Sequence, residues 1–158
     1  LALYLTMYSP LQMVADLPEN YKKYNDAFQF IKDVPCNWSR SIYLEAEPAD
    51  YITVARQDKN SNDWYIGGKC DENGHKSVLK LDFLDKDYVY DCTIYADAKN
   101  ADYKNNPKAY KITHRKVKKG DVLKLTMAPG GGFAISLGAR WNGEEHAEQL
   151  TKVNNTDF

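Results

Sequence analysis

The sequence predicts a mainly β fold: an antiparallel β-sandwich or Greek key of about eight strands, preceded by two or three short helices. Three observations predict it. Apolar residues recur at helical spacing before Pro35 but alternate with polar residues after it. Twelve tyrosines, within a 13% share of aromatic residues, favour half-buried strands. The strands follow one another at short spacing with few helices between them, which indicates antiparallel rather than parallel sheets.

The helical patterns lie in residues 1–34. A proline inside a helix removes a hydrogen bond, so Pro10 predicts that a first helix ends near Tyr8. Ser9 and Pro10 fit an N-cap and a first helical position, which predicts a second helix over 10–16. The apolar residues with helical spacing are Leu1, Tyr4, Leu5, Tyr8 and Leu11.

A third helical segment opens at Asp16–Glu19, where Pro18 repeats the start signal, and Pro35 closes it. Its apolar stripe consists of Tyr21, Tyr24, Phe28 and Ile31. The first helix begins on apolar residues without a cap or an acidic first turn, so we expect that this chain was cut from a longer one.

Eight segments after Pro35 are predicted to be strands. The polar turn Asp58–Asp63 predicts a hairpin between the second and third strands, and Lys118–Asp121 predicts another between the sixth and seventh. Gly67 and Gly68 inside the third strand indicate a bulge or a close backbone approach. The predicted strands are Ser41–Glu47, Tyr51–Arg56, Trp64–Lys69, Lys76–Phe83, Tyr88–Asp97, Ala109–Val117, Val122–Met127 and Phe133–Leu137.

Periodicity also predicts which strand faces are covered and where the domain ends. The inward residues of the fifth and eighth strands are Tyr88, Tyr90, Cys92, Ile94 and Ala96, and Phe133, Ile135 and Leu137. Periodicity is lost after Gly138. We therefore divide the chain into helices over 1–34, a β-sandwich over 35–138 and a tail over 139–158, in which Glu144–Val153 is either a weak helix or disordered.

Composition limits the function classes. At 158 residues the chain is too short for a complete (β/α)₈ barrel, which needs about 250. The formal net charge of −1 gives no pull toward nucleic acid or an anionic membrane, and no apolar run reaches the ~18 residues of a spanning helix. Cys36, Cys70 and Cys92 lack metal-ligand spacing; three isolated thiols are favoured over one disulfide.

The sequence contains partial matches to two binding motifs. Asp58, Asn60 and Asn62 have the spacing of the first calcium-loop ligands, but Asp63 and Lys69 replace the required glycine and glutamate, so a polar hairpin loop is favoured. A phosphate cradle needs a helix after its glycines. Pro129–Gly132 instead precedes a strand and is predicted to be a turn.

Catalytic arrangements are equally incomplete. Glu45 and Glu47 share a strand face, as two glycosidase carboxylates could, but a small sandwich leaves no cleft, so a solvated face is favoured. The basic run His114–Lys119 is predicted to be a solvated hairpin tip. The histidines lie in unrelated segments: His75, His114 and His146. We predict no catalytic, cofactor-binding or metal-binding residue in this chain.

Several segments resemble glycoside hydrolase family 97. YLTMYSPLQMVADLPENY is similar to the last barrel helices of that family, through Ser9, Pro10, Leu11, Gln12, Met13, Ala15, Asp16, Pro18 and Tyr21. DYITVARQ, NDWYIGG, LDFLDKDYVYDCTIYADAKNADY and MAPGGGFAISL resemble its C-terminal β domain, through Trp64, Gly67, Gly68, Phe83, Leu84, Tyr95, Asp97 and the Gly130–Phe133 run. The resemblance covers roughly Leu1–Leu137.

This resemblance implies a non-catalytic C-terminal structural and oligomerisation module of an exo-acting α-glycosidase, either an α-glucosidase or an α-galactosidase. Family members depend on calcium, and their catalytic carboxylates and calcium ligands lie upstream of the matched region. We therefore expect no cofactor in this chain, the rest of the barrel and further copies as partners, oligosaccharide contact only through the parent enzyme, and a periplasmic location. The apolar residues left without a barrel are Leu1, Leu5, Tyr8, Leu11 and Met13.

A carbohydrate-binding module is the alternative. Trp38, Trp64 and Tyr65 are aromatic residues that could stack on sugar rings. The opposing interpretation places them in the core or in an interface.

Overall fold

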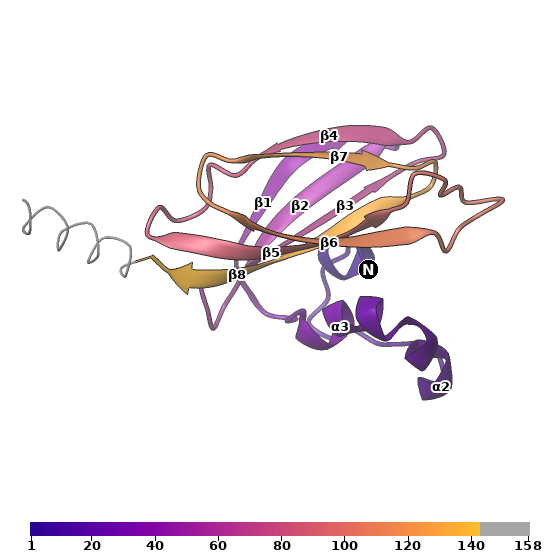
Figure 1. Cartoon of the computed structure of the whole chain (residues 1–158), viewed down its shortest axis with the longest axis horizontal. Coiled ribbons are helices and arrows are strands. Elements are labelled where there is room, and N and C mark those ends of the chain that lie inside the picture. Colours follow the sequence, from indigo (N-terminus) through magenta and orange to yellow (C-terminus); the bar gives the residue numbers. More distant parts are fainter. Residues whose placement is uncertain (143–158) are drawn as a thin grey trace, which may run out of the picture.

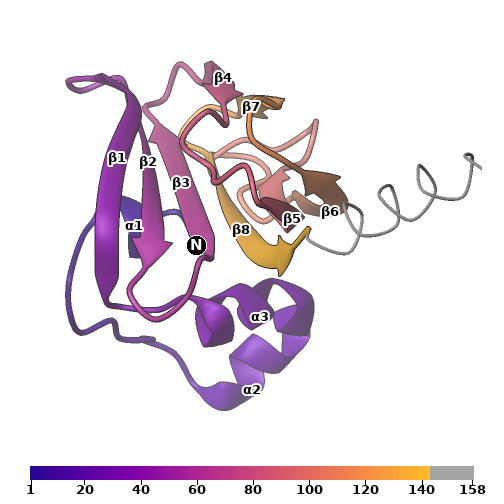
Figure 2. The same ribbon diagram turned by 90° about the vertical axis from the view of Figure 1, so that its left-hand side faces the viewer.

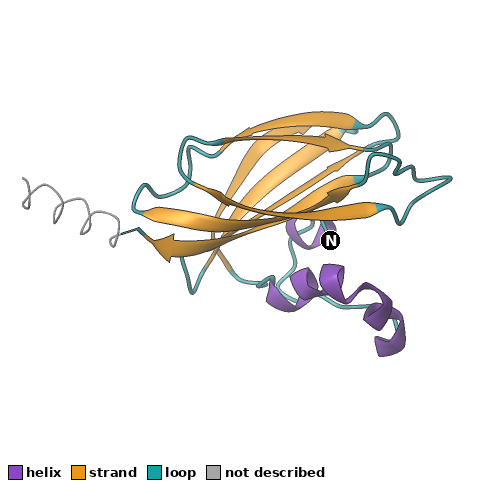
Figure 3. Cartoon of the chain, in the orientation of Figure 1, coloured by secondary structure: helices purple, strands orange, loops and turns teal. Residues whose placement is uncertain are grey.

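The computed structural model describes residues 1–142, which form two packed antiparallel sheets with helices on one side (Figures 1 and 3). Six strands form the larger sheet, in the order β1-β2-β3-β8-β5-β6, and β4 and β7 form the smaller one. The strands are β1 (Trp38–Glu47), β2 (Tyr51–Asp58), β3 (Trp64–Cys70), β4 (His75–Lys80), β5 (Tyr88–Asp97), β6 (Tyr110–Val117), β7 (Val122–Met127) and β8 (Gly132–Trp141). The sandwich expected from the sequence is confirmed.

One of the two predicted hairpins is present. β2 pairs with β3 in continuous register, from Gln57 opposite Trp64 to Tyr51 opposite Cys70. The hairpin expected around Lys118–Asp121 is wrong, because β6 pairs with β5 while β7 pairs with β4. The four-residue connection crosses between the sheets, and this crossing places apolar β7 residues over the inner face of the larger sheet.

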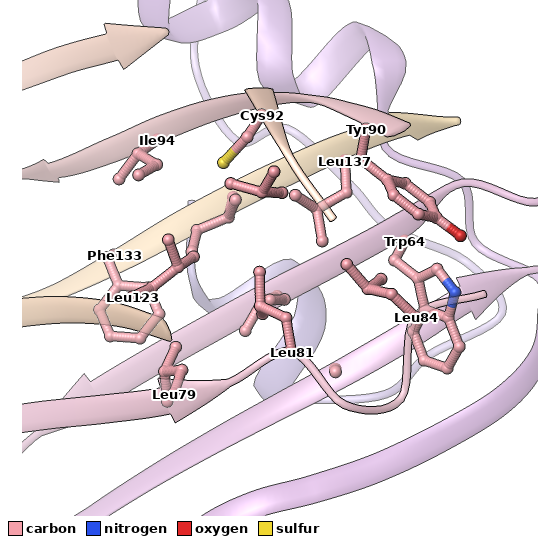
Figure 4. Close-up of a cluster of buried hydrophobic side chains, with 14 of the residues drawn as sticks. Trp64, Leu79, Leu81, Leu84, Tyr90, Cys92, Ile94, Leu123, Phe133 and Leu137 are labelled. Atoms are coloured by element: carbon pink, nitrogen blue, oxygen red, sulfur yellow. The ribbon is translucent and has the colours of Figure 1, made fainter. Parts of the chain in front are cut away.

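The main core fills the space between the sheets (Figure 4). The inward faces predicted for the fifth and eighth strands are confirmed, with Tyr90, Ile135 and Leu137 fully buried. β8 continues to Trp141 instead of ending at Leu137, because its last residues still pair with the start of β5. The other core residues are Ala55, Trp64, Ile66, Leu79, Leu81, Leu84, Cys92, Ile94, Ala96, Val117, Leu123, Met127 and Phe133.

The helices lie on the side of the larger sheet that faces away from β4 and β7 (Figures 1 and 2). They are α1 (Leu3–Thr6), α2 (Pro18–Tyr21), the 3₁₀ turn η1 (Lys22–Tyr24) and α3 (Asn25–Asp33). The helix predicted over 10–16 is wrong. Ser9 Oγ accepts the Leu11 N–H at 3.3 Å and donates to the Leu11 carbonyl at 2.7 Å, so its hydroxyl stabilises a local turn instead of capping a helix.

The apolar stripe predicted for the third helical segment is partly confirmed, because Tyr21, Phe28 and Ile31 are half-buried. The fully buried residue of α3 is Phe30, which the stripe omitted. Tyr21 stacks on Phe28 at 4.7 Å between ring centroids, while Tyr24 remains exposed. Phe30 was missed because it packs on Tyr65 and Tyr95 of the sheet, a contact that helical spacing within the segment does not reveal.

A close backbone approach explains the glycine pair in β3. A Cβ at Gly67 would lie 2.6 Å from the Leu5 Cβ and 2.9 Å from the Ala2 carbonyl oxygen. A Cβ at Gly68 would overlap the Phe133 ring. Pairing runs through both glycines without a register shift, so the close approach is confirmed and the alternative of a bulge is wrong.

Two sequence predictions concern membranes and the chain end. No helix within residues 1–142 has the length and apolar character needed to cross a membrane. The weak helix considered over Glu144–Val153 lies outside the described residues.

Candidate functional site

Exposed apolar side chains are concentrated in residues 1–17. The most exposed are Met13, at 79% of its surface, and Leu11, at 71%. We call this set the N-terminal apolar surface: Leu1, Leu3, Met7, Tyr8, Leu11, Met13, Val14 and Leu17. A short segment that leaves this many large apolar side chains exposed is a candidate interaction surface.

Leu5 and Arg56 fasten this surface to the sandwich. Leu5 was expected to be exposed, but it is completely buried where α1 packs on β3. Arg56, only 5% exposed, donates from Nε to the Leu5 carbonyl at 2.7 Å and from Nη1 to Ser41 Oγ at 2.6 Å. Its guanidinium also lies 5.5 Å from the Tyr8 ring centroid. A buried cation therefore satisfies a carbonyl at the end of α1 and holds the segment on β2.

Sequence reasoning missed Arg56. Its neighbours in β2, Val54 and Ala55, are fully buried, and so is Thr53, so both faces of the strand are covered at this point. A charged residue in such a strand is itself a sequence signal, because arginine is almost never buried without partners.

α3 is fixed to the same sheet face by aromatic contacts and hydrogen bonds. Phe30 meets Tyr65 and Tyr95 edge-on, with centroid distances of 6.1 and 5.4 Å. The Tyr110 hydroxyl donates to Asp26 Oδ1 at 2.8 Å. This hydrogen bond raises the pKa of Tyr110 to about 12 and lowers the pKa of Asp26. The helical layer is thus packed on the sheet through specific contacts and belongs to the folded domain.

The Glu45 side chain lies in a polar cluster that links the sheets. It accepts hydrogen bonds from Thr53 Oγ1, at 2.9 Å, and from Ser77 Oγ, and its other oxygen lies 3.4 Å from His75 Nε2. The His75 ring stacks on Tyr51 at 3.6 Å. The solvated face predicted for Glu45 is therefore wrong. Its oxygens are already engaged by the protein, which leaves it unsuited to glycoside hydrolysis with Glu47.

The polar loop between β2 and β3 is held by its own side chains. Ser61 Oγ donates to Asp58 Oδ2 at 2.8 Å, and Asn62 Nδ2 donates to the Tyr88 hydroxyl at 2.8 Å. Asp63 Oδ1 accepts the Ala139 N–H at 2.7 Å. Within residues 1–142, no three His, Cys, Asp or Glu side chains gather as metal ligands.

The glycine-rich turn before β8 encloses a carboxylate. Asp97 Oδ2 accepts the N–H groups of Ala128 and Gly132 at 2.9 and 2.8 Å. Burial nevertheless raises the pKa of Asp97, because desolvation outweighs these two hydrogen bonds. The prediction that Pro129–Gly132 is a turn is confirmed.

The aromatic residues of the sugar-binding alternative are packed inside the domain. Trp64 is 2% exposed and tilts against Phe83 in the core, and Tyr65 is 8% exposed beneath α3. Trp38 packs edge-on against Tyr65, with centroids 5.8 Å apart. These three rings form packing contacts and provide no open stacking platform.

Comparison with known families identifies the sandwich. The sequence model described as "Glycosyl-hydrolase 97 C-terminal, oligomerisation" matches residues 37–138. This chain belongs to that family. The match covers all eight strands apart from the last residues of β8 and excludes the helical region. The expected family 97 resemblance is confirmed.

Curated relatives of this family 97 chain are glycosidases. It is 35% identical, over 87% of its length, to a retaining α-galactosidase of Bacteroides thetaiotaomicron. It is 25% identical, over 84% of its length, to a probable retaining α-galactosidase of Streptomyces bingchenggensis. The chain spans only 20% and 19% of these relatives.

Solved structures extend the comparison. A glycoside hydrolase family 97 enzyme from Pseudoalteromonas sp. strain K8, in complexes with panose and with acarbose, is 45% identical, with a TM-score of 0.86. The match covers 88% of this family 97 chain and 22% of that enzyme. A β-arabinopyranosidase, with a TM-score of 0.67 and 23% identity over 85% of this chain and 20% of its own, shares the fold.

Proposed function

We propose that this chain is the C-terminal assembly module of a family 97 α-glycosidase, and that it carries no catalytic group of its own. The observation that carries the proposal is a difference in coverage. The match includes 88% of this chain but only 22% of the Pseudoalteromonas enzyme. The description of the matched family as an oligomerisation domain supports an assembly role.

The N-terminal apolar surface points to the first partner. Eight apolar side chains gather there, although the sandwich beside them buries its apolar residues efficiently. Burying such a surface contributes about 25 cal/mol per Å² of apolar area. The partner proposed for this surface is the catalytic barrel of the same protein, and homo-oligomer contacts then involve other faces of the sandwich.

The proposed parent enzyme cleaves α-glycosidic bonds in oligosaccharides. The curated relatives are α-galactosidases, at 35% and 25% identity. The Pseudoalteromonas enzyme is described with panose and acarbose and is 45% identical. Both α-glucosides and α-galactosides are therefore candidate substrates of the parent, and its catalytic part decides between them.

Calcium and a periplasmic location complete the proposal, and both rest on the family resemblance. The calcium would be held by the catalytic part of the parent, outside this chain. Chelation of the complete gene product should abolish its hydrolytic activity, and added calcium should restore it. Cell fractionation should place the protein in the periplasm; recovery in the cytoplasm would refute that location.

The first experiment measures the intact denatured mass of the native gene product. We expect a mass several times the 18.1 kDa of this chain. A mass near 18.1 kDa would mean a free-standing domain and would overturn the proposal. Aryl α-glucosides and aryl α-galactosides should then be assayed with the complete product and with the 158-residue chain, and only the complete product should hydrolyse either one.

Matched variants of the complete gene product test the apolar surface. Leu11→Ser with Met13→Ser removes two of its most exposed side chains and should loosen the module, seen as faster proteolytic release. Val78→Ser with Val122→Ser is the control, because both valines are exposed on the smaller sheet, at 57% and 45%. Equal release rates in the two double variants would contradict docking through the N-terminal apolar surface.

A further inference from the structure

In residues 1–142, no strand pairs with the outer edge of β7. The smaller sheet consists of β4 and β7, so β7 pairs with β4 along one edge and leaves its other edge open. Within the part of the chain that the structure describes, the backbone–backbone hydrogen bonds of β7 all belong to its ladder with β4. A strand edge of this kind presents N–H and C=O groups that can pair with a further strand.

β7 lacks the features by which proteins protect an exposed strand edge. Its pairing with β4 is in continuous register, and the strand contains no proline. Its inward side chains are the apolar Leu123, Leu125 and Met127, so no charge points inward from it. The edge strand β1, by contrast, has two register shifts in its pairing with β2. The β7 edge can therefore accept another strand, whereas the irregular register disfavours this at β1.

The open edge of β7 lies beside the uncovered inner side of β6. β4 lies over β1, where Ser77 donates to Glu45, and β7 lies across β8 and β5. β6 follows β5 as the last strand of the larger sheet, so it lies beyond β7 (Figure 2). Lys111, Thr113 and Arg115 of β6 pair with core residues of β5 and share their inward face, yet all three are exposed. A further strand beside β7 would cover this side of β6.

A cavity of about 780 Å³ occupies the space beside the β7 edge. Its lining includes four successive residues of β7, 124–127, and successive residues of a strand point to opposite faces. The cavity therefore borders β7 along its edge and not on one face alone. Ala96 of β5, Lys111 of β6 and the turn before β4 also line it. This is the space that a strand paired with β7, about 4.8 Å away, would enter.

Charge determines which kind of strand fits. Lys111 and Arg115 lie on the inward face of β6, and neither belongs to an ion pair within residues 1–142. The Asp97 carboxylate also lines the cavity, but its Oδ2 accepts the N–H groups of Ala128 and Gly132. Carboxylates at every second position of an added strand would face the two cations and form charge-assisted hydrogen bonds with them.

A second copy of this chain does not supply such a strand. Among the exposed edge strands that the structure describes, β4, β6 and β7 contain no Asp or Glu. β1 contains Glu45 and Glu47, but Glu45 already accepts hydrogen bonds from Thr53 and Ser77. The helices and the N-terminal apolar surface lie on the other side of the larger sheet (Figure 1). The partner that fits the β7 edge is therefore a different protein.

We propose that the β7 edge binds an extended acidic segment of another protein as a third strand of the smaller sheet. Backbone hydrogen bonds to β7 supply the affinity, and Asp or Glu at every second position of the segment faces Lys111 and Arg115. The added strand also covers Leu125, which is only half-buried at the edge of the core.

Fluorescence anisotropy of the complete gene product with a labelled peptide tests the proposal. The probe has nine residues in which threonine alternates with glutamate, and we expect saturable binding. Successive residues of a strand direct their N–H groups to opposite edges, and the glutamates must face β6. N-methylation of all glutamates or of all threonines therefore blocks pairing with β7 in one of the two peptides. That peptide should bind about tenfold more weakly, and the other should bind like the unmodified probe.

Matched variants of the complete gene product test the charge. Lys111→Glu with Arg115→Glu reverses the inward face of β6 and should weaken binding of the unmodified probe about tenfold. The control is Lys116→Glu with Lys118→Glu, which makes the same change in net charge. Lys116 lies on the other face of β6 and Lys118 in the turn that follows, and both are exposed, so this variant should keep the original affinity.

Three results would overturn strand addition at β7. They are a lack of saturable binding, an equal loss of affinity with both N-methylated peptides, and an equal loss in both double variants. The second would mean attraction to charge without backbone pairing, and the third would place the contact elsewhere. Because the intact mass decides the assembly proposal and peptide binding decides this one, the two proposals can fail independently.

Discussion

The core between the sheets and the N-terminal segment contain similar apolar side chains but differ in how far they bury them. Leu137 and Ile135 of β8 are completely buried, whereas Leu11 and Met13 are 71% and 79% exposed. In the sandwich, the inner face of the larger sheet is covered by the same chain, because β7 crosses over and forms the smaller sheet with β4. Apolar burial therefore stabilises the sandwich internally, while the N-terminal segment leaves its apolar groups exposed.

The change from buried to exposed apolar side chains occurs within a few residues of α1. Leu5 is buried against β3, and Met7, two positions later, is 62% exposed. Arg56 fixes this boundary by binding the Leu5 carbonyl. The segment is thus anchored at one point and open beyond it, which suits a connection between a domain and a neighbouring body.

Truncation of a core leucine should give the largest effect on this comparison. Leu137→Ala removes a fully buried side chain from the core and should lower the free energy of unfolding of the 158-residue chain by about 3 kcal/mol. Leu11→Ala should change it by less than about 0.5 kcal/mol, because that side chain is exposed. Urea denaturation measures both values, and similar losses would show that residues 1–17 are folded into the same core.

Adding a methyl group at the α1 contact should have the next largest effect. Gly67→Ala places a Cβ 2.6 Å from the Leu5 Cβ and should destabilise the chain by about 2 kcal/mol through overpacking. Gly138→Ala is the control in β8, because its new Cβ would meet its nearest neighbour at 3.9 Å. Urea denaturation should separate the two variants. A Gly67→Ala protein as stable as Gly138→Ala would mean that α1 is not packed on β3 in solution.

Alkaline titration should distinguish the buried thiol of the core. Burial raises the pKa of Cys92 from 9.0 to about 11. A pKa raised by folding stabilises the protein below the unfolded value, and this stabilisation is lost as pH rises from 9 through about 11. Cys92→Ala should therefore show a smaller fall in stability across this range than wild type.

Wild type is the reference for that titration, and Cys36, which is partly buried, is left in place in both proteins. Urea unfolding at pH 8 and pH 10.5 gives the comparison. Identical pH slopes for wild type and Cys92→Ala would contradict burial of this thiol.

The sequence was sufficient to predict the sandwich because its strands alternate clearly. In β5, every second residue from Tyr90 to Ala96 lies in the core, as periodicity predicted. The pairing of β6 and β7 was not predictable in this way. A four-residue turn joins a hairpin or a crossing equally well, and only the packing of Leu123 and Met127 over the larger sheet decides between them.

The interaction surface was predicted in outline, with errors in its details. Exposure of Tyr8, Leu11 and Met13 followed from a helical stripe without a barrel to cover it, and all three are exposed. Leu5 and Phe30 were misjudged because both pack on the sheet face that β3 and β5 provide, a surface that local periodicity cannot reveal. Tertiary contact therefore determined the side chains that anchor the helical layer.

The smallest expected effect concerns the turn between β1 and β2. Ala49 has a φ of +74°, in the left-handed region where a Cβ is disfavoured. Ala49→Gly removes this strain at some cost in chain entropy and should stabilise the domain by about 0.5 kcal/mol. Ala101→Gly, in the loop after β5, relieves no positive φ, so it should lower the free energy of unfolding by several tenths of a kcal/mol. Thermal unfolding should therefore shift in opposite directions for the two variants. A lower melting temperature for Ala49→Gly would show that the positive φ of Ala49 does not destabilise the sandwich.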